Sequence, residues 1–272
     1  MLSERDRNPA RDGGSSIHPV NPAHQQDRFG VRFEWGLAGA RAVAQNCEVA
    51  VVVDVLSFTT TLSVALDAGI TVLPYRTRGT EAAAFAAEVD ATLAVGRSKA
   101  RGDQISLSAP TIRNRSVPPE RLVLPSPNGS TISYELATSA PTVVGASLRN
   151  ARSVASWICD TFSADTGVAV IAAGEQWPDG SLRPAFEDMW GAGAVLSVMA
   201  TRGWREHFSP ESVAAAAAWA SVEPVMTGQL RACASGRELI DAGYSQDVAI
   251  AAELNTSIHV PVLRGDRFVS AG

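Results

Sequence analysis

The feature that most constrains the fold is a repeated unit, in which a short apolar run of strand length is followed by a polar loop and a helix-length segment. The clearest copy spans residues 47–69, where the apolar run ends on Asp54. Similar units follow at residues 121–140, 142–160 and 168–203. Short turns cannot join parallel strands, whereas helical crossovers can. The alternation therefore predicts an α/β fold, with a layered α/β/α arrangement around a largely parallel sheet.

Changes in composition along the chain predict its domain boundaries. Residues 1–28 contain few large apolar side chains, so we expect a disordered N-terminal tail. Residues 29–272 are expected to form one domain, either as a single layered unit or as two similar subdomains. Residues 95–120 are rich in charge, Gly and Pro and predict a long loop or a small excursion. Residues 211–243 predict helices, and residues 259–272 predict a terminal hairpin or strand.

Composition restricts the class of protein and its partners. The 272 residues have a formal net charge of -5 and 46% hydrophobic content, which is typical of a mildly acidic globular protein without a nucleic-acid surface. No apolar stretch approaches the ~20 residues needed to span a bilayer, and the N-terminus lacks an apolar signal core, so we expect a cytoplasmic protein. The three cysteines are far apart, which favours buried thiols over disulfides.

Chemistry is expected where the predicted parallel strands end, because ligands collect beyond the carboxyl ends of strands and near helix N-termini. Four loops lie at such places: residues 54–61, 126–131, 147–150 and 174–188. They contain mainly carboxylates, hydroxyls, amides and glycines. These groups suit a phosphate or a metal-bound phosphate.

Three carboxylates are the main candidates for catalysis or metal binding. Asp54 ends a run of apolar residues, where a charge is costly unless it is paired, coordinated or exposed at the strand end. Glu187 and Asp188 are adjacent within an otherwise apolar stretch. Their position in the first turn of a helix has a structural explanation in the helix dipole. A hard cation would also prefer these oxygen ligands, so both interpretations stay open.

The second loop, SPNGST, contains Asn128, Gly129 and Ser130. Its backbone N–H groups could cradle an anion, and an Asn-Gly turn followed by a helix cap would give the same string. In the first loop, Ser57, Thr59 and Thr60 open the helix-length segment. Their hydroxyls are candidate phosphate ligands.

Basic side chains near the loops are candidates for anion binding. Arg149, beside Asn150 at a helix start, could grip a phosphate in a fork or be merely solvated. Arg97, Lys99 and Arg101 form a compact basic group that could steer an anionic substrate or be an exposed charged loop.

Several familiar arrangements are absent. The sequence has no GxSxG, Walker A or GxGxxG string, and its four histidines fall outside the four loops. This argues against a serine-hydrolase triad, a nucleoside-triphosphate loop and a histidine phosphatase. A haloacid-dehalogenase-type phosphatase would need a second Asp two positions after Asp54, where this chain has Leu56.

Four strings resemble, in order and spacing, the 2-phosphosulfolactate phosphatase family: VVVDVLSFTTTLSVAL, SPNGS, GASLRNARSVA and AAGEQ…FEDMWGAG. The similarity extends from about residue 29 to the C-terminus. It implies a Mg²⁺-dependent phosphatase that converts 2-phosphosulfolactate to sulfolactate and phosphate, a step towards coenzyme M. The partner it implies is a small anionic phosphoester, and a homodimer is compatible with it.

By motif position, the resemblance implies a site that contains Asp54, Asn128, Gly129, Asn150, Glu187 and Asp188. As hypotheses for individual roles, Asp54, Glu187 and Asp188 bind Mg²⁺ or activate water, while Ser57, Thr59, Asn128 and Ser130 hold phosphoryl oxygens.

The chain departs from the family pattern at two places. Ser57 stands where the pattern has Arg, and Arg97 falls where it has a Gly-Glu-Arg string. The loss of one cation and one carboxylate could change the substrate. Arg97 or Lys99 could compensate for the lost positive charge. A protein that binds phospho-acids without turnover is the alternative.

Overall fold

The computed structural model describes residues 21–271, and its centre is a nine-stranded sheet. In spatial order the strands are β1 (Val31–Trp35), β7 (Val168–Ala172), β2 (Val49–Val53), β6 (Thr142–Ala146), β10 (Pro261–Arg264), β11 (Arg267–Ser270), β3 (Thr71–Tyr75), β5 (Arg121–Pro125) and β4 (Thr92–Leu93). A separate two-stranded ribbon consists of β8 (Glu175–Gln176) and β9 (Leu182–Arg183).

The parallel strands fall into two blocks of this one sheet. Strands β1, β7, β2 and β6 form the first block, and β3, β5 and β4 form the second. The C-terminal hairpin β10–β11 lies between them and pairs antiparallel with β6 and β3. The predicted α/β fold with a largely parallel sheet is confirmed, and residues 259–272 do contain the expected hairpin. The strands of all four predicted units join one continuous sheet.

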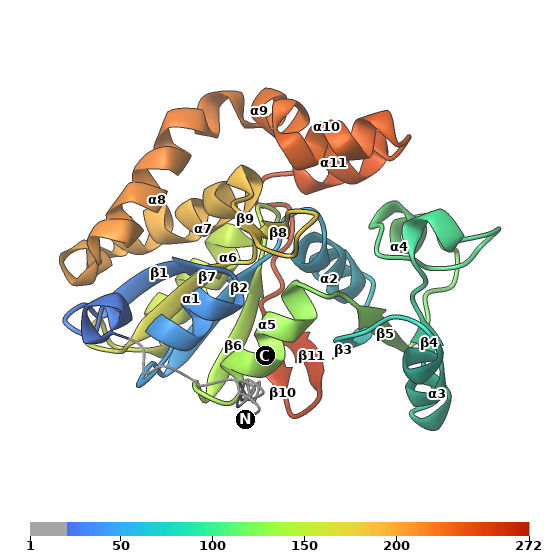
Figure 1. The fold of residues 1–272 in the computed structure, drawn as a ribbon, viewed down its shortest axis with the longest axis horizontal. Helices are drawn as coiled ribbons and strands as arrows, with labels where there is room; N and C mark the ends of the chain where they lie inside the picture. Colours follow the sequence, from blue (N-terminus) through green and yellow to red (C-terminus); the bar gives the residue numbers. More distant parts are fainter. Residues whose placement is uncertain (1–20, 272) are drawn as a thin grey trace, which may run out of the picture.

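Helices cover both faces of the sheet, as Figure 1 shows. They are α1 (Gly36–Val43), α2 (Phe58–Asp67), α3 (Thr80–Glu88), α4 (Pro110–Arg113), α5 (Gly129–Leu136), α6 (Ala151–Thr161), α7 (Phe186–Met199), α8 (Pro210–Val222), α9 (Met226–Ala232), α10 (Ala234–Asp241) and α11 (Ser245–Ala251). Short 3₁₀ turns occur at η1 (Pro22–Gln25), η2 (Arg97–Lys99), η4 (Arg205–His207) and η5 (Glu223–Val225), and η3 (Ala200–Trp204) is π-helical. Among the described residues, no helix is long and apolar enough to cross a membrane.

The central strand β2 shows why the sequence makes three layers. All five of its residues are buried, and successive side chains point to opposite faces. Val51 belongs to the hydrophobic cluster that includes residues of α6, α7 and α8. Val52 belongs to the cluster on the other face, with residues of α1, α2 and α5. A strand buried on both faces reads as a continuous apolar run, which is the pattern seen before Asp54.

The predicted N-terminal tail meets the structure only in its last residues, because residues 1–20 lie outside the described part of the chain. Residues 21–28 contain η1, and Gln26 is buried. Its side-chain amide donates to the carbonyl of Phe33 at 2.9 Å and accepts from the N–H of Phe33 at 3.2 Å. These bonds occupy backbone groups of the edge strand β1, so the ordered domain begins before residue 29.

The irregular region predicted between residues 95 and 120 is an excursion that contains η2 and α4, between β4 and β5 in the chain. In Figure 1 it extends at one side of the molecule, and helices α9, α10 and α11 form an arch above the sheet. The two segments meet at Arg97, which bonds to Asp247 in α11. The excursion therefore contributes side chains to the region above the strand ends.

Candidate active site

The carboxylate of Asp54 links the starts of two helices. It is 7% exposed and lies directly after β2. One oxygen, Oδ1, accepts from the backbone N–H of Phe58 at 3.0 Å, and Oδ2 accepts from the N–H of Gly129 at 3.1 Å. These N–H groups belong to the first residues of α2 and α5, whose free donors favour negative charge. Asp54 therefore lies where two helix N-termini meet.

Two neighbours fix this arrangement. The Thr59 hydroxyl donates to the carbonyl of Asp54 at 2.7 Å and accepts from its N–H at 3.0 Å. At Gly129 there is no space for a side chain, since an added Cβ would overlap the Phe58 ring and lie 2.8 Å from Oδ2 of Asp54. Glycine is thus required for the close approach of the α5 N-terminus to the carboxylate.

The Asp188 carboxylate joins the ends of two neighbouring strands. Its Oδ1 accepts from the N–H of Val55 at 2.7 Å, just beyond β2, and its Oδ2 accepts from the N–H of Gly174 at 2.9 Å, just beyond β7. Asp188 is 3% exposed and lies in the first turn of α7. It positions the loops that carry Asp54 and Glu175.

Buried carboxylates at these loops carry a surplus of negative charge. Burial raises the pKa of Asp54 to about 6, against the lowering effect of its two backbone N–H donors, and Glu187 raises it further. Burial, Asp54 and Glu187 raise the pKa of Glu175 to about 7. Burial followed by the charges of Asp54 and Glu187 raises the pKa of Asp188 well above its ordinary value. Such mutual repulsion is common at functional sites.

Glu187 lies next to this group and is 2% exposed. Burial raises the pKa of the nearby Cys233 thiol to about 12, and the negative charge of Glu187 contributes to this rise. The thiol donates to the carbonyl of Leu230 at 3.2 Å. Cys233 is therefore held as a neutral thiol. Of the three thiols predicted to be buried, Cys47 is buried, whereas Cys159 and Cys233 are half-buried.

A cavity of about 290 Å³ opens beside Asp54, and we call it the catalytic cavity. Its lining includes two carboxylates, two guanidinium groups, an amide and a hydroxyl, contributed by Asp54, Glu175, Arg78, Arg97, Asn128 and Ser57. The Asn128 amide donates to Glu175 Oε2 and to the Gly174 carbonyl, both at 3.2 Å. Acid-base groups and anion-binding groups thus share one small space.

The guanidinium of Arg97 is held in position by three side chains. It donates to the Ser57 hydroxyl, and its Nε donates to Oδ1 of Asp247 at 3.0 Å. It also lies over the Tyr244 ring, 5.7 Å from the centroid. The second oxygen of Asp247 accepts from the Ser108 hydroxyl at 2.8 Å. Arg97 therefore reaches the cavity from the excursion, supported by α11.

Several predicted ligands serve other purposes in the structure. The Arg149 guanidinium donates to Ser63 at 2.9 Å and to Asp67 at 2.7 Å, and it also bonds to Glu253. Asn150 accepts from the N–H of Ser147 at 2.8 Å. Neither Arg149 nor Asn150 lines the catalytic cavity, so their placement does not support a phosphate contact.

Three predicted hydroxyl ligands, Ser130, Thr60 and Thr59, also lie outside the cavity. Ser130 donates to the carbonyl of Leu124 at 3.2 Å and is fully buried. The hydroxyl of Thr60 is buried without a hydrogen-bond partner among the described residues. Thr59 is occupied by the backbone of Asp54, as described above. Of the predicted hydroxyls, Ser57 is the one that lines the cavity.

Sequence reasoning did not single out Glu175, Arg78 or Asp247. Glu175 had a recognisable signal, because it follows an apolar strand-length run as Asp54 does. Arg78 lies a few residues beyond β3, in a segment without a motif. Asp247 is far from Arg97 in the sequence, and only the folded chain shows that the two form an ion pair.

The donors at this site suit a hard cation in their chemistry but do not form a ready-made cage. Among residues 21–271, no group of three or more His, Cys, Asp or Glu side chains is arranged to hold a metal ion. The repulsion between Asp54 and Glu187 identifies two carboxylates whose charges a divalent cation would neutralise. Mg²⁺ commonly takes one or two protein carboxylates and completes its shell with water and substrate phosphate. Asp54 and Glu187 are therefore the residues that would hold such an ion.

The α/β fold and this combination of acid-base and anion-binding groups suit a phosphatase, a phosphoric monoester hydrolase, and the names of the matching family and of two relatives indicate that class. Comparison with known proteins identifies the family. The 2-phosphosulpholactate phosphatase family matches residues 39–266, so the chain belongs to that family.

Two relatives support this assignment. A protein of Deinococcus radiodurans called a probable 2-phosphosulfolactate phosphatase is 31% identical over 229 residues, which cover 83% of this chain and 91% of the relative. A protein of Thermus thermophilus with the same name is 30% identical over 220 residues, which cover 80% of this chain and 89% of the relative.

Proposed function

We propose that this protein hydrolyses 2-phosphosulfolactate to sulfolactate and phosphate, with Mg²⁺ as its metal ion. The observation that carries the proposal is the catalytic cavity, in which Asp54 and Glu175 lie together with Arg78 and Arg97. The names of the two relatives support the substrate. The substrate is a compact trianionic or tetra-anionic acid, and a small cavity with two arginines suits it.

Anion binding rests on groups that are already in place. Arg97 is fixed by Asp247 and Ser57, so little side-chain entropy is lost when it binds a phosphoryl or sulfonate oxygen. The N-termini of α2 and α5 add positive potential next to Asp54. Arg78 lines the cavity and makes no hydrogen bond with any of residues 21–271, so its guanidinium is available to a second acid group of the substrate.

The metal ion is proposed to lie on Asp54 and Glu187, because Glu187 is the carboxylate that raises the pKa of Asp54 most strongly. When bound there, Mg²⁺ would offset negative charge on the transferring phosphoryl group. Asp54 is kept in this set although each of its oxygens accepts a backbone N–H, because its carboxylate lines the catalytic cavity. Asp188 is left out, since it does not line that cavity and both of its oxygens hold the backbone of the two strand-end loops. Its proposed role is to position Asp54 and Glu175.

Proton transfer is assigned to Glu175. Phosphoryl transfer has a loose transition state in which charge develops on the leaving oxygen, so a proton donor placed beside that oxygen would stabilise the transition state. A carboxyl with a pKa of about 7 is partly protonated at neutral pH. As water attacks phosphorus and the bond from phosphorus to the ester oxygen breaks, Glu175 donates its proton to the departing alkoxide. The attacking water loses its proton to solvent, and Glu175 is then reprotonated.

The test is phosphate release from racemic 2-phosphosulfolactate, with Mg²⁺ and with chelator, by the unmodified chain and by Asp54→Asn and Glu175→Gln. We expect Mg²⁺-dependent release, at least 100-fold slower in both variants. Glu88→Gln, the same change at an exposed position of α3, is the matched control for Glu175→Gln and should retain full activity. Release that is unaffected by chelator would contradict the Mg²⁺ assignment. Tight binding without any release would indicate a binding protein.

A further inference from the structure

We propose that a second cavity, next to the catalytic cavity, binds the organic part of a longer phosphomonoester that ends in an acid group. This inference rests on the proposed function, because it extends the substrate class of the same site. It predicts that the chain accepts phospho-acids well beyond the three carbons of sulfolactate.

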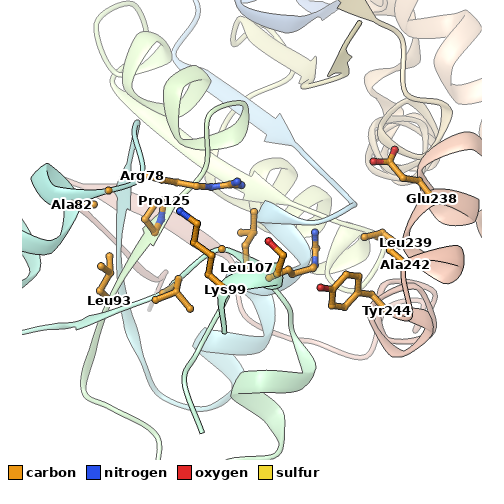
Figure 2. Close-up of a pocket in the computed structure, with 16 residues that line it drawn as sticks. Arg78, Ala82, Leu93, Lys99, Leu107, Pro125, Glu238, Leu239, Ala242 and Tyr244 are labelled. Atoms are coloured by element: carbon orange, nitrogen blue, oxygen red, sulfur yellow. The ribbon is translucent and has the colours of Figure 1, made fainter. Parts of the chain in front are cut away.

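The second cavity has a volume of about 430 Å³ and lies between the excursion, the start of α3 and the turn from α10 to α11. Figure 2 shows Arg78 and Lys99 on one side of it and Leu239, Ala242 and Tyr244 on the other. Arg78, Arg97 and Leu107 line both this cavity and the catalytic cavity. The two spaces are thus adjacent and share walls at the two arginines.

The walls of the second cavity combine apolar surface with positive charge. Its apolar lining includes Ala82, Leu93, Leu107, Pro125 and Leu239. This surface suits a hydrocarbon segment, because burial of methylene groups is favourable.

Lys99 supplies a further positive charge to this cavity. It makes no hydrogen bond or ion pair with any of residues 21–271, and Glu238 lies across the cavity from it in Figure 2. A cation without a protein partner beside apolar surface fits a carboxylate or sulfonate at the end of a hydrocarbon chain. The pairing would be partly exposed, so the apolar contacts are expected to supply most of the affinity.

The volumes of the two cavities indicate a substrate larger than phosphosulfolactate. The catalytic cavity, at about 290 Å³, is already close to the lower limit of typical ligand sites, about 300 Å³. A three-carbon acid therefore does not need the additional 430 Å³. The second cavity adjoins the catalytic cavity at the two arginines that would bind the charged groups of the substrate. It is therefore suited to the organic part of a larger ester.

The experiment compares kcat/KM for phosphate esters of 2-hydroxy acids of three to eight carbons, each with and without a terminal carboxylate. We expect an increase of about fourfold for each methylene group until the cavity is filled. A terminal carboxylate should add about threefold, as expected for a partly exposed ion pair, and Lys99→Gln should remove this addition. Leu239→Trp, which fills the cavity, should lower the ratio of long to short substrates at least tenfold. Ile258→Trp, at a surface position that is 83% exposed, is the matched control and should leave the ratio unchanged.

A second measurement does not depend on turnover. Calorimetry with unphosphorylated 2-hydroxy dicarboxylic acids, in the presence of inorganic phosphate, should show a Kd that decreases with chain length and increases in Leu239→Trp. If 2-phosphosulfolactate is hydrolysed while kcat/KM and Kd do not improve with length, the second site is refuted and the proposed function stands. If no ester is hydrolysed, the proposed function fails, and calorimetry alone decides whether the second cavity binds the longer acids.

Discussion

Glu175→Gln should stabilise the folded chain at alkaline pH, in addition to its effect on catalysis. The pKa of this carboxyl rises from 4.5 to about 7 in the folded protein, mainly through burial and secondly through Asp54 and Glu187. Because the folded-state pKa lies above the unfolded value, the stability that this group contributes is complete below pH 4.5 and is lost as the pH rises through 7. A shift of this size corresponds to at most about 3 kcal/mol. Glutamine carries no charge, so the variant lacks this pH dependence.

The assay is urea denaturation between pH 4.5 and pH 8.5 with chelator present, comparing the unmodified chain with Glu175→Gln. The difference in the free energy of unfolding should grow by about 3 kcal/mol in favour of the variant over that range. The Asn128 amide can still donate to the glutamine oxygen, so the cavity should keep its shape. Glu88→Gln, at an exposed site, should show no such growth. A difference that stays constant within 0.5 kcal/mol, about the error of such a comparison, would refute the assignment of a raised pKa to Glu175.

Three further substitutions test the architecture around the cavity. Asp188→Ala leaves two buried N–H groups without acceptors and should cost about 2–6 kcal/mol in urea denaturation, and a loss below about 1 kcal/mol would contradict its role at the strand ends. Gly129→Ala places a Cβ 2.8 Å from Oδ2 of Asp54 and should reduce phosphate release at least 100-fold, so an active variant would show that this close approach is dispensable. Asp247→Asn removes the charged partner of Arg97 and should raise KM about tenfold with a smaller change in kcat, whereas an unchanged KM would show that Arg97 needs no support.

The sequence was sufficient for the fold because each strand–loop–helix unit has a local signal. Buried parallel strands are continuous apolar runs, and β2 is the clearest case. The same rule located Asp54, because a charge directly after such a run stands at the edge where ligands bind. Its contact with Gly129 connects two of the predicted loops, although the hydrogen bond itself required the folded chain.

The loop after β6 shows what this reasoning leaves out. The rule that ligands bind at strand ends does not distinguish one loop from another, so Arg149 and Asn150 were candidates for the site on the same footing as Asp54. In the structure the C-terminal segment packs over that loop, and Asn150 donates to the carbonyl of His259 at 3.3 Å. This packing comes from residues more than a hundred positions away. Local patterns do not contain that information, and for the same reason the burial that shifts the pKa of Glu175 could not be foreseen.

The ion pair of Arg97 and Asp247 has a consequence for how this chain recognises its substrate. Ser57 stands where the family pattern has an arginine, and the structure brings the guanidinium of Arg97 onto the Ser57 hydroxyl. The cation is thus supplied by the excursion and braced by α11, instead of by the loop that carries Asp54. The same two segments form opposite sides of the second cavity, so this ion pair both holds Arg97 at the catalytic cavity and joins the walls of the adjoining space. Under the two proposals made above, the ion pair would couple anion binding to the length of the substrate.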